Sequence, residues 1–360
     1  MNHAAAKVTT PAGDGVRVWP AALSDGVVRG TADVVAAAEV MAGELGCPTV
    51  PLVPEGGATA QPVVRTLVAA AGLGVDIGPR GFRLVHRPGA FYAQAEQAWR
   101  RDAEVIAGVW GRQEEVCVPV VGPWTAAAAL ELANGHKALR DPGAVRELAQ
   151  AVARSAAAQV DFFAAHAGIS RAVVLLGESG LGEVVRGGVS DGCRLDPVRA
   201  VPAADAGELL ALVAAAIKNQ ASVPVRVLLR VVGEQPPWDA VQASGVEGLM
   251  LDAAATAGSD NLDALAGWWD AAPSGLDTGR SLAFPIPWRL QPAGGEYAPA
   301  RRAAICYARL IDQLGLDRVA TASTLIPAVA GHPGPVTELA AAVGLARRTG
   351  DILRRDAGDL

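Results

Sequence analysis

The chain has 360 residues, of which 51% are hydrophobic and 19% are charged, so it has enough apolar surface for a substantial core and too little charge for long disordered segments. Its formal net charge is −6, and no run of Lys and Arg with interleaved aromatic residues occurs, which excludes the usual pattern of a nucleic-acid-binding protein. We expect a globular protein with no nucleic-acid partner.

Nothing in the sequence predicts a targeting or membrane segment. Residues 1–15 lack the charged start and apolar core of a signal peptide, and the apolar runs elsewhere are too short to cross a bilayer. A cytoplasmic location without a membrane partner is therefore expected. The four cysteines, Cys47, Cys117, Cys193 and Cys306, show no C-x-x-C spacing, and we expect all of them to be reduced.

Short β-branched or apolar runs alternate with Ala-rich segments of helical length, which is typical of βα units around a parallel sheet. The runs predict eight strands, at 16–21, 48–53, 116–121, 172–176, 225–232, 248–251, 282–286 and 319–322. Helices are predicted at 32–45, 63–71, 91–109, 125–132, 145–165, 206–218, 261–269, 298–314 and 335–355. Eight parallel strands close a barrel, so the predicted fold is an α/β (β/α)8 TIM barrel.

Residues 75–88 (VDIGPRGFRLVHRP) do not fit the eightfold count and predict a hairpin or insertion after the second βα unit, placed over the mouth of the barrel. The sequence contains no Ser- or Pro-rich linker that is long enough to separate independent domains. The sequence therefore predicts one barrel domain over residues 1–360.

In a barrel of this kind, reactive groups lie at the carboxyl ends of the strands, which is the C-terminal face of the barrel. We therefore expect a small-molecule ligand at this face. The candidate binding residues each end or follow a predicted strand: Trp19, Trp124, Glu178, Arg230, Asp252 and Trp288.

Glu178 has two interpretations, which the sequence leaves open. Glu178 follows a buried strand, where loss of hydration would raise the pKa of its carboxyl and suit it as a ligand anchor or base. The alternative is a structural carboxylate paired with Arg230 from the next strand. Likewise, the tryptophans either line a pocket for a planar ligand or pack in the core at the barrel mouth.

The segment GPWTAAAALELANGHKALRDPGAVRELAQAVA, residues 122–153, resembles the short methionine synthases of GC-rich bacteria. In that family a G-P-[WV]-T turn follows a strand, and an L-x-x-G-H-x segment leads into a long helix. Residues 173–189, VVLLGESGLGEVVRGGV, are similar to the family's strand that ends in Asp-Glu-Pro. The resemblance implies the cobalamin-independent methionine synthase family, a methyltransferase barrel of the group that includes uroporphyrinogen decarboxylase.

The resemblance also implies a zinc ion, which activates the thiol of homocysteine for methyl transfer from a folate. The family holds it with a His-x-Cys pair after the fifth strand, a Glu after the sixth and a Cys after the eighth. This sequence has Leu-Leu-Arg-Val-Val at 228–232, Asp252 after the sixth strand and Ser323 at the last position. The five histidines form no metal-binding pair. We expect no metal and no other cofactor.

Three functional hypotheses follow. The first is a divergent methionine synthase-like barrel, a possible pseudoenzyme, that keeps a binding role but cannot perform zinc-dependent methyl transfer to homocysteine. The second is a metal-free enzyme of the uroporphyrinogen decarboxylase type that acts on an acidic small molecule through Arg230, Asp252 and Glu178. The third is a non-catalytic binding protein, whose signature would be a closed or hydrophobically filled mouth.

Overall fold

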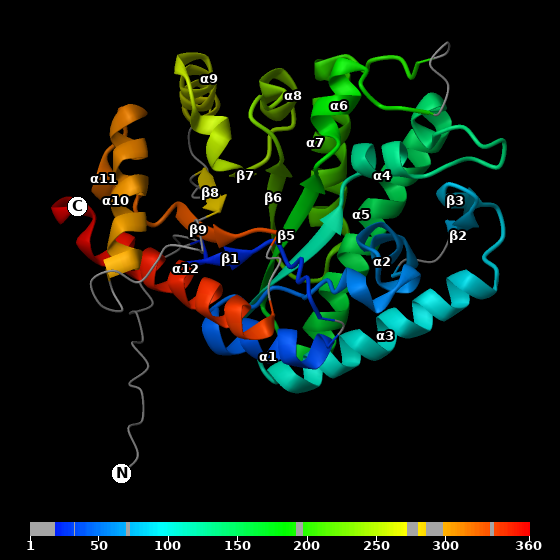
Figure 1. The fold of residues 1–360 in the computed structure, drawn as a ribbon, viewed down its shortest axis with the longest axis horizontal. Helices are drawn as coiled ribbons and strands as arrows, with labels where there is room; N and C mark the ends of the chain where they lie inside the picture. The colour runs from blue at the N-terminus through cyan, green and yellow to red at the C-terminus, as the bar shows by residue number, and fades with distance from the viewer. Residues whose placement is uncertain are drawn as a thin grey trace.

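A computed structural model describes residues 19–31, 33–69, 73–191, 197–271, 280–285, 298–331 and 335–360. Strands and helices alternate along the chain, as the sequence predicts. Seven parallel strands form one sheet in the order β1-β9-β8-β7-β6-β5-β4 (Figure 1). Their bounds are β1 Leu23–Ser24, β4 Glu115–Val121, β5 Arg171–Glu178, β6 Val225–Val231, β7 Gly248–Leu251, β8 Ser281–Pro285 and β9 Leu325–Val329.

The sheet curls into a nearly closed barrel, and residues 49–52 join its two edges. Thr49 forms an isolated parallel bridge to Cys117 of β4, and Leu52 forms another to Val27, just beyond β1. Backbone hydrogen bonds support both, from the Val50 amide to the Cys117 carbonyl and from the Val28 amide to the Leu52 carbonyl. This segment takes the place of the strand predicted at 48–53.

Helices cover the outside of the barrel, as Figure 1 shows. The longer ones are α1 Val34–Glu44, α3 Ala90–Trp110, α5 Pro142–Ala167, α7 Ala203–Gln220, α9 Ser259–Asp270, α10 Ala298–Gln313 and α12 Val336–Asp356. The shorter ones are α2 Pro62–Val68, α4 Pro123–Ala129, α6 Leu181–Arg186, α8 Trp238–Ala243 and α11 Arg318–Thr321. Among the helices of the described ranges, none is long and apolar enough to cross a membrane.

Local chemistry explains where several helices begin and end. Asp33 caps α1, because its carboxylate accepts hydrogen bonds from the amides of Val35 and Ala36. Asp141 caps α5 in the same way, and Pro142 occupies the first helical position, where no amide donor is needed. Gly168 closes α5 in the left-handed conformation that favours glycine.

Side chains of the strands alternate between two buried layers. Outward-facing residues pack against the helices in the larger hydrophobic core. Inward-facing residues form a smaller core inside the barrel, made of Trp19, Leu23, Cys47, Cys117, Val173, Leu175, Leu228, Met250, Ala283, Ile326 and Ala328. A filled interior leaves only the two ends of the barrel open to chemistry.

The first and last strands differ from the prediction. β1 is Leu23–Ser24; of the predicted strand at 16–21, only 19–21 lie within the described residues, and they are not a strand. Residues 318–321 form α11, in which the Thr321 hydroxyl donates to the Asp317 carbonyl, and the strand is the fully buried run β9 that follows. The buried five-residue run, rather than the short β-branched segment before it, supplies the strand because it can pack on both faces.

The segment predicted as an insertion forms an antiparallel hairpin of β2 (Gly74–Gly78) and β3 (Gly81–Val85). It lies beside the barrel, near α2 and α3 (Figure 1), where the Leu84 amide donates to the Glu131 carbonyl at 2.7 Å. None of the described residues that line the barrel mouth belongs to it. The prediction that it covers the mouth is wrong.

Candidate functional site

A pocket of about 310 Å³ lies at the carboxyl ends of the barrel strands, and we call it the mouth pocket. Its walls come from the ends of β4, β5 and β6, from the segments that follow β1 and β9, and from the starts of α2 and α4. The polar side chains among its described lining residues are Asp25, Arg29, Thr125, Ser179 and Arg230. Parallel strands gather these groups because their carboxyl ends meet at one face.

Arg230 reaches the centre of this pocket from β6. It is two residues beyond Leu228, which faces the barrel interior, so the alternation of the strand also turns Arg230 inward. Its Nε lies 3.8 Å from Asp25 Oδ2 and its Nη2 lies 3.7 Å from Asp252 Oδ1. Nη1 is buried and has no hydrogen-bond partner among the described residues. The guanidinium is therefore held by charge, and the N–H donors of Nη1 are left without an acceptor among the described residues.

Asp25 is the principal counter-charge to Arg230. Its Oδ1 accepts a hydrogen bond from the Val27 amide at 3.1 Å, and its Oδ2 accepts one from the Gly331 amide at 2.8 Å. Burial raises the pKa of this carboxyl, and the nearby Arg230 and the two amides only partly offset that effect. A carboxyl that holds its proton more readily, next to a cation and facing a pocket, can donate or accept a proton in chemistry.

Asp252 lies where the sequence predicts it, directly after β7. Its Oδ2 accepts a hydrogen bond from the Gly233 amide at 2.9 Å, which ties the end of β7 to the loop after β6. The side chain remains 31% exposed. It therefore completes the charged group around Arg230 from the more open side.

Glu178 does not face the mouth pocket. It lies one residue beyond the inward-facing Gly177, so its side chain points outward and is buried below the start of α4. Its carboxylate accepts hydrogen bonds from the Trp124 amide at 3.0 Å, the Thr125 amide at 2.8 Å and the Thr125 hydroxyl at 2.7 Å. No ion pair joins it to Arg230, although the structure describes both side chains. The predicted pair is wrong, and Glu178 instead anchors a helix end.

The G-P-W-T turn is built around this carboxylate. A Cβ at Gly122 would lie 2.3 Å from Glu178 Oε1, so only glycine fits at that position. Trp124 is buried in the helix layer, and its indole N–H donates to the Ala206 carbonyl at 2.9 Å. Of the alternatives for Trp124, the structure therefore supports core packing. Burial also raises the pKa of Glu178 from 4.5 to about 7, against the effect of the three donors.

Trp19 lies at the opposite end of the barrel from the mouth pocket. Its ring stacks 4.4 Å from the guanidinium carbon of Arg226, near the start of β6, and Arg226 also forms a buried ion pair with Glu115 at the start of β4. The side chain of Arg354 donates to the Trp19 carbonyl. The prediction that Trp19 lies at the carboxyl ends of the strands is wrong, because β1 begins after it. Trp288 lies outside the described residues.

The residues present do not fit the zinc site that the resemblance implies. The positions after β6 and β7 offer Arg230 and Asp252, and the residue after β9 is Ala330, since Ser323 precedes that strand instead of following it. A guanidinium between two carboxylates already supplies the positive charge that a cation would bring. In the described part of the chain, no group of three His, Cys, Asp or Glu side chains could hold a metal ion.

The candidate residues predicted from the sequence do not include the charged residues Asp25 and Arg29 of this site, nor Thr125 and Ser179. The two charged residues both follow β1, and the misplaced first strand moved attention to Trp19. The signal was present in Ser24-Asp25-Gly26, two polar residues and a glycine directly after the apolar pair Ala22-Leu23. Gly26 adopts a φ of 79°, which favours glycine and turns the chain at the mouth.

No protein-family model matches this chain, and no curated protein matches it.

Proposed function

We propose that this chain is a (β/α)8 barrel protein of the methionine synthase-like type that binds a small acidic or zwitterionic molecule in the mouth pocket, without zinc-dependent methyl transfer to homocysteine. The observation that carries the proposal is Arg230, whose side chain lines the mouth pocket and whose buried Nη1 has no hydrogen-bond partner among the described residues. A buried donor without an acceptor costs about 1–3 kcal/mol, and a ligand carboxylate would recover that cost.

The charges around the pocket support a ligand with an acidic group. Arg29 and Arg230 both line it, and the carboxylate oxygens of Asp25 already accept two backbone hydrogen bonds. Asp252 stands at the open side and is the group available to an ammonium. A zwitterionic ligand would place its carboxylate at Arg230 and its amine toward Asp252. A ligand with two acidic groups would place one at Arg230 and the other toward Arg29.

The test uses three probes of different charge: glutarate, which is a dianion, L-methionine, which is a zwitterion, and propylamine, which is a cation. We expect glutarate or L-methionine to raise the melting temperature and to bind in isothermal titration calorimetry, whereas propylamine does neither. Arg230→Gln should weaken this binding at least about tenfold, the effect of losing roughly 1.4 kcal/mol of charge-assisted hydrogen bonding. Arg100→Gln, at an exposed position on α3, is the control and should bind as the wild type does.

Two results would contradict the proposal. The first is binding of glutarate and L-methionine that Arg230→Gln leaves unchanged. The second is stoichiometric zinc in protein purified without a chelator, together with methionine formation from homocysteine and a methylated folate. The second result would mean that the protein has the ordinary activity of the family that its sequence resembles.

A second candidate function is a metal-free enzyme of the uroporphyrinogen decarboxylase type, and the environment of Asp25 favours it. Burial raises the pKa of this carboxyl, which lies beside Arg230. It can therefore donate a proton to the substrate carbon that bears the departing carboxylate. In a decarboxylation, the carbon–carbon bond breaks, carbon dioxide leaves, and the remaining carbanion takes the proton from Asp25. Oxaloacetate is a suitable probe: accelerated loss that Asp25→Asn abolishes, with glutarate affinity retained, would favour this candidate.

A further inference from the structure

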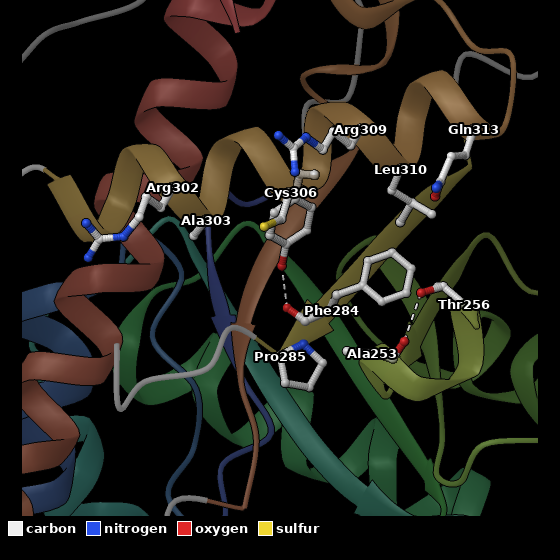
Figure 2. Close-up of a pocket in the computed structure, with 11 residues that line it drawn as sticks. Ala253, Thr256, Phe284, Pro285, Arg302, Ala303, Cys306, Arg309, Leu310 and Gln313 are labelled. Carbon is white, nitrogen blue, oxygen red and sulfur yellow. Dashed lines mark hydrogen bonds between the residues drawn. The ribbon is translucent and has the colours of Figure 1, made fainter. Parts of the chain in front are cut away.

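A second and larger pocket, of about 460 Å³, lies in the helix layer outside the barrel. One wall is a stripe of α10 from Arg302 to Gln313, and the other comes from the end of β8 and from the short 3-10 helix η4 (Ala253–Thr256). Figure 2 shows Arg302 and Gln313 at the two ends of the stripe, with Phe284 and Thr256 opposite. It shares no described lining residue with the mouth pocket, so it is a separate site.

The pocket runs along one face of α10. Its lining residues there recur at the spacing of one helix face, and the first and last of them, Arg302 and Gln313, are eleven helical steps apart. At 1.5 Å of rise per residue, this face is about 16 Å long. That length suits an extended chain better than a compact ring system.

Most of the wall is apolar and firmly placed. Phe284, Pro285, Ala303 and Leu310 line it with carbon, and the ring of Phe284 packs edge-on against that of Tyr307, with the ring centroids 6.1 Å apart. The Tyr307 hydroxyl donates to the Phe284 carbonyl, as the dashed line in Figure 2 marks, so that polar atom is already used. The hydroxyl of Thr256 likewise donates to the Ala253 carbonyl at 2.8 Å, so the wall offers an apolar surface on which both hydroxyl groups are satisfied.

The charged groups of the pocket are all of one sign. Arg302 and Arg309 line it from α10, whereas no Asp or Glu occurs among its described lining residues. Both arginines are exposed, so their guanidinium groups can swing toward a ligand while their stems lie along the apolar wall. Pockets of this size that are apolar with a few polar groups at the edge are typical of small-molecule sites.

From the length, the apolar walls and the uniform positive charge, we infer that this pocket binds an elongated amphipathic anion: an apolar chain along α10, with one carboxylate held by Arg302 or Arg309. This inference does not depend on the proposed function, because no residue of the mouth pocket takes part in it.

The probe is decanoate below its micelle concentration, measured by calorimetry with the full chain. We expect saturable binding of decanoate, and at least about tenfold weaker binding of 1-decanol and decyltrimethylammonium, because neither offers a negatively charged acceptor to a guanidinium. The double variant Arg302→Gln/Arg309→Gln should bind decanoate no better than 1-decanol. Arg301→Gln, an exposed neighbour on α10 that does not line the pocket, is the control and should leave decanoate binding unchanged.

Cys306 gives a second readout at the pocket itself. It lines the pocket and its thiol is exposed, so its alkylation by iodoacetamide, followed by mass spectrometry of its peptide, should slow when decanoate binds. Cys306→Trp should fill the pocket from an exposed position and abolish binding, with an unchanged melting temperature as the check on folding. Equal binding by Cys306→Trp, equal affinity for the three probes, or no effect of the double variant would overturn the inference.

Failure of this inference and failure of the proposed function give different results. Decanoate binding should persist in Arg230→Gln, whose mouth pocket is altered, whereas glutarate binding should persist in Cys306→Trp. If decanoate binding is lost in Arg230→Gln and retained in Cys306→Trp, the anion binds at the mouth pocket and this inference is wrong.

Discussion

The pH dependence of stability should report directly on Glu178. Its carboxyl has a pKa of about 7 in the folded protein, raised from 4.5 because it is buried. The folded state therefore keeps a proton that the unfolded state releases between pH 4.5 and 7. The contribution of Glu178 to stability is complete below pH 4.5 and is lost as the pH rises through 7.

The size of the effect follows from the pKa difference. Each pKa unit corresponds to about 1.36 kcal/mol, so the change from 4.5 to about 7 amounts to roughly 3 kcal/mol for Glu178. Burial raises the pKa of Asp25 as well, so the wild type alone does not isolate one group. The variant Glu178→Gln removes the titration and keeps the shape of the side chain, and the difference between the two proteins isolates Glu178.

The assay is urea unfolding at pH 5, 6, 7 and 8, with the free energy of unfolding extrapolated to water. We expect the wild type to lose stability over this range and Glu178→Gln to lose about 3 kcal/mol less over the full titration. Glu104→Gln, at an exposed position on α3, is the control and should follow the wild type. Parallel pH profiles for wild type and Glu178→Gln would refute the reasoning, and a gain in the Glu178 contribution with pH would mean that its three donors outweigh burial.

Two further substitutions test the packing around the barrel. Gly122→Ala places a Cβ 2.3 Å from Glu178 Oε1 and should destabilise the fold by about 2 kcal/mol or more. The control is Gly43→Ala in α1, where nothing lies within 4 Å of the added Cβ, and it should be neutral or stabilising by about 0.5–1 kcal/mol. Equal effects of the two substitutions in thermal unfolding would contradict the geometry. Arg226→Met leaves the buried Glu115 with Arg171, 3.4 Å away, as its remaining ion-pair partner, and should cost about 1–3 kcal/mol in urea unfolding. An unchanged free energy of unfolding would mean that Arg171 alone compensates Glu115.

Three strands that the sequence located well, β4, β6 and β7, are buried along almost their whole length. The prediction at 248–251 coincides with β7, and those at 116–121 and 225–232 agree with β4 and β6 to within one residue at each end. A wholly apolar run is typical of a parallel strand covered on both faces, so composition alone reveals it. β1 is only two residues long, and such a short element leaves no pattern to detect.

The candidate site shows where sequence reasoning stops. Gly177 pairs with Arg230 in the register of β5 and β6, so the neighbouring Glu178 points to the other face of the sheet. A shift of one residue in a strand exchanges the two faces, and the sequence does not specify which residue of Gly177-Glu178 turns inward. The predicted partner of Arg230 was therefore wrong, although Arg230 and Asp252 both lie at the mouth of the barrel.

The sequence by itself determined the alternation of strands and helices, the parallel sheet and the end of the barrel at which Arg230 and Asp252 lie, because these follow from local runs and from the common direction of parallel strands. Only the tertiary structure decided that Asp25 faces Arg230, that Trp19 fills the opposite end and that Glu178 anchors α4. These contacts join residues far apart in the chain, and they depend on register and closure, which no local pattern encodes.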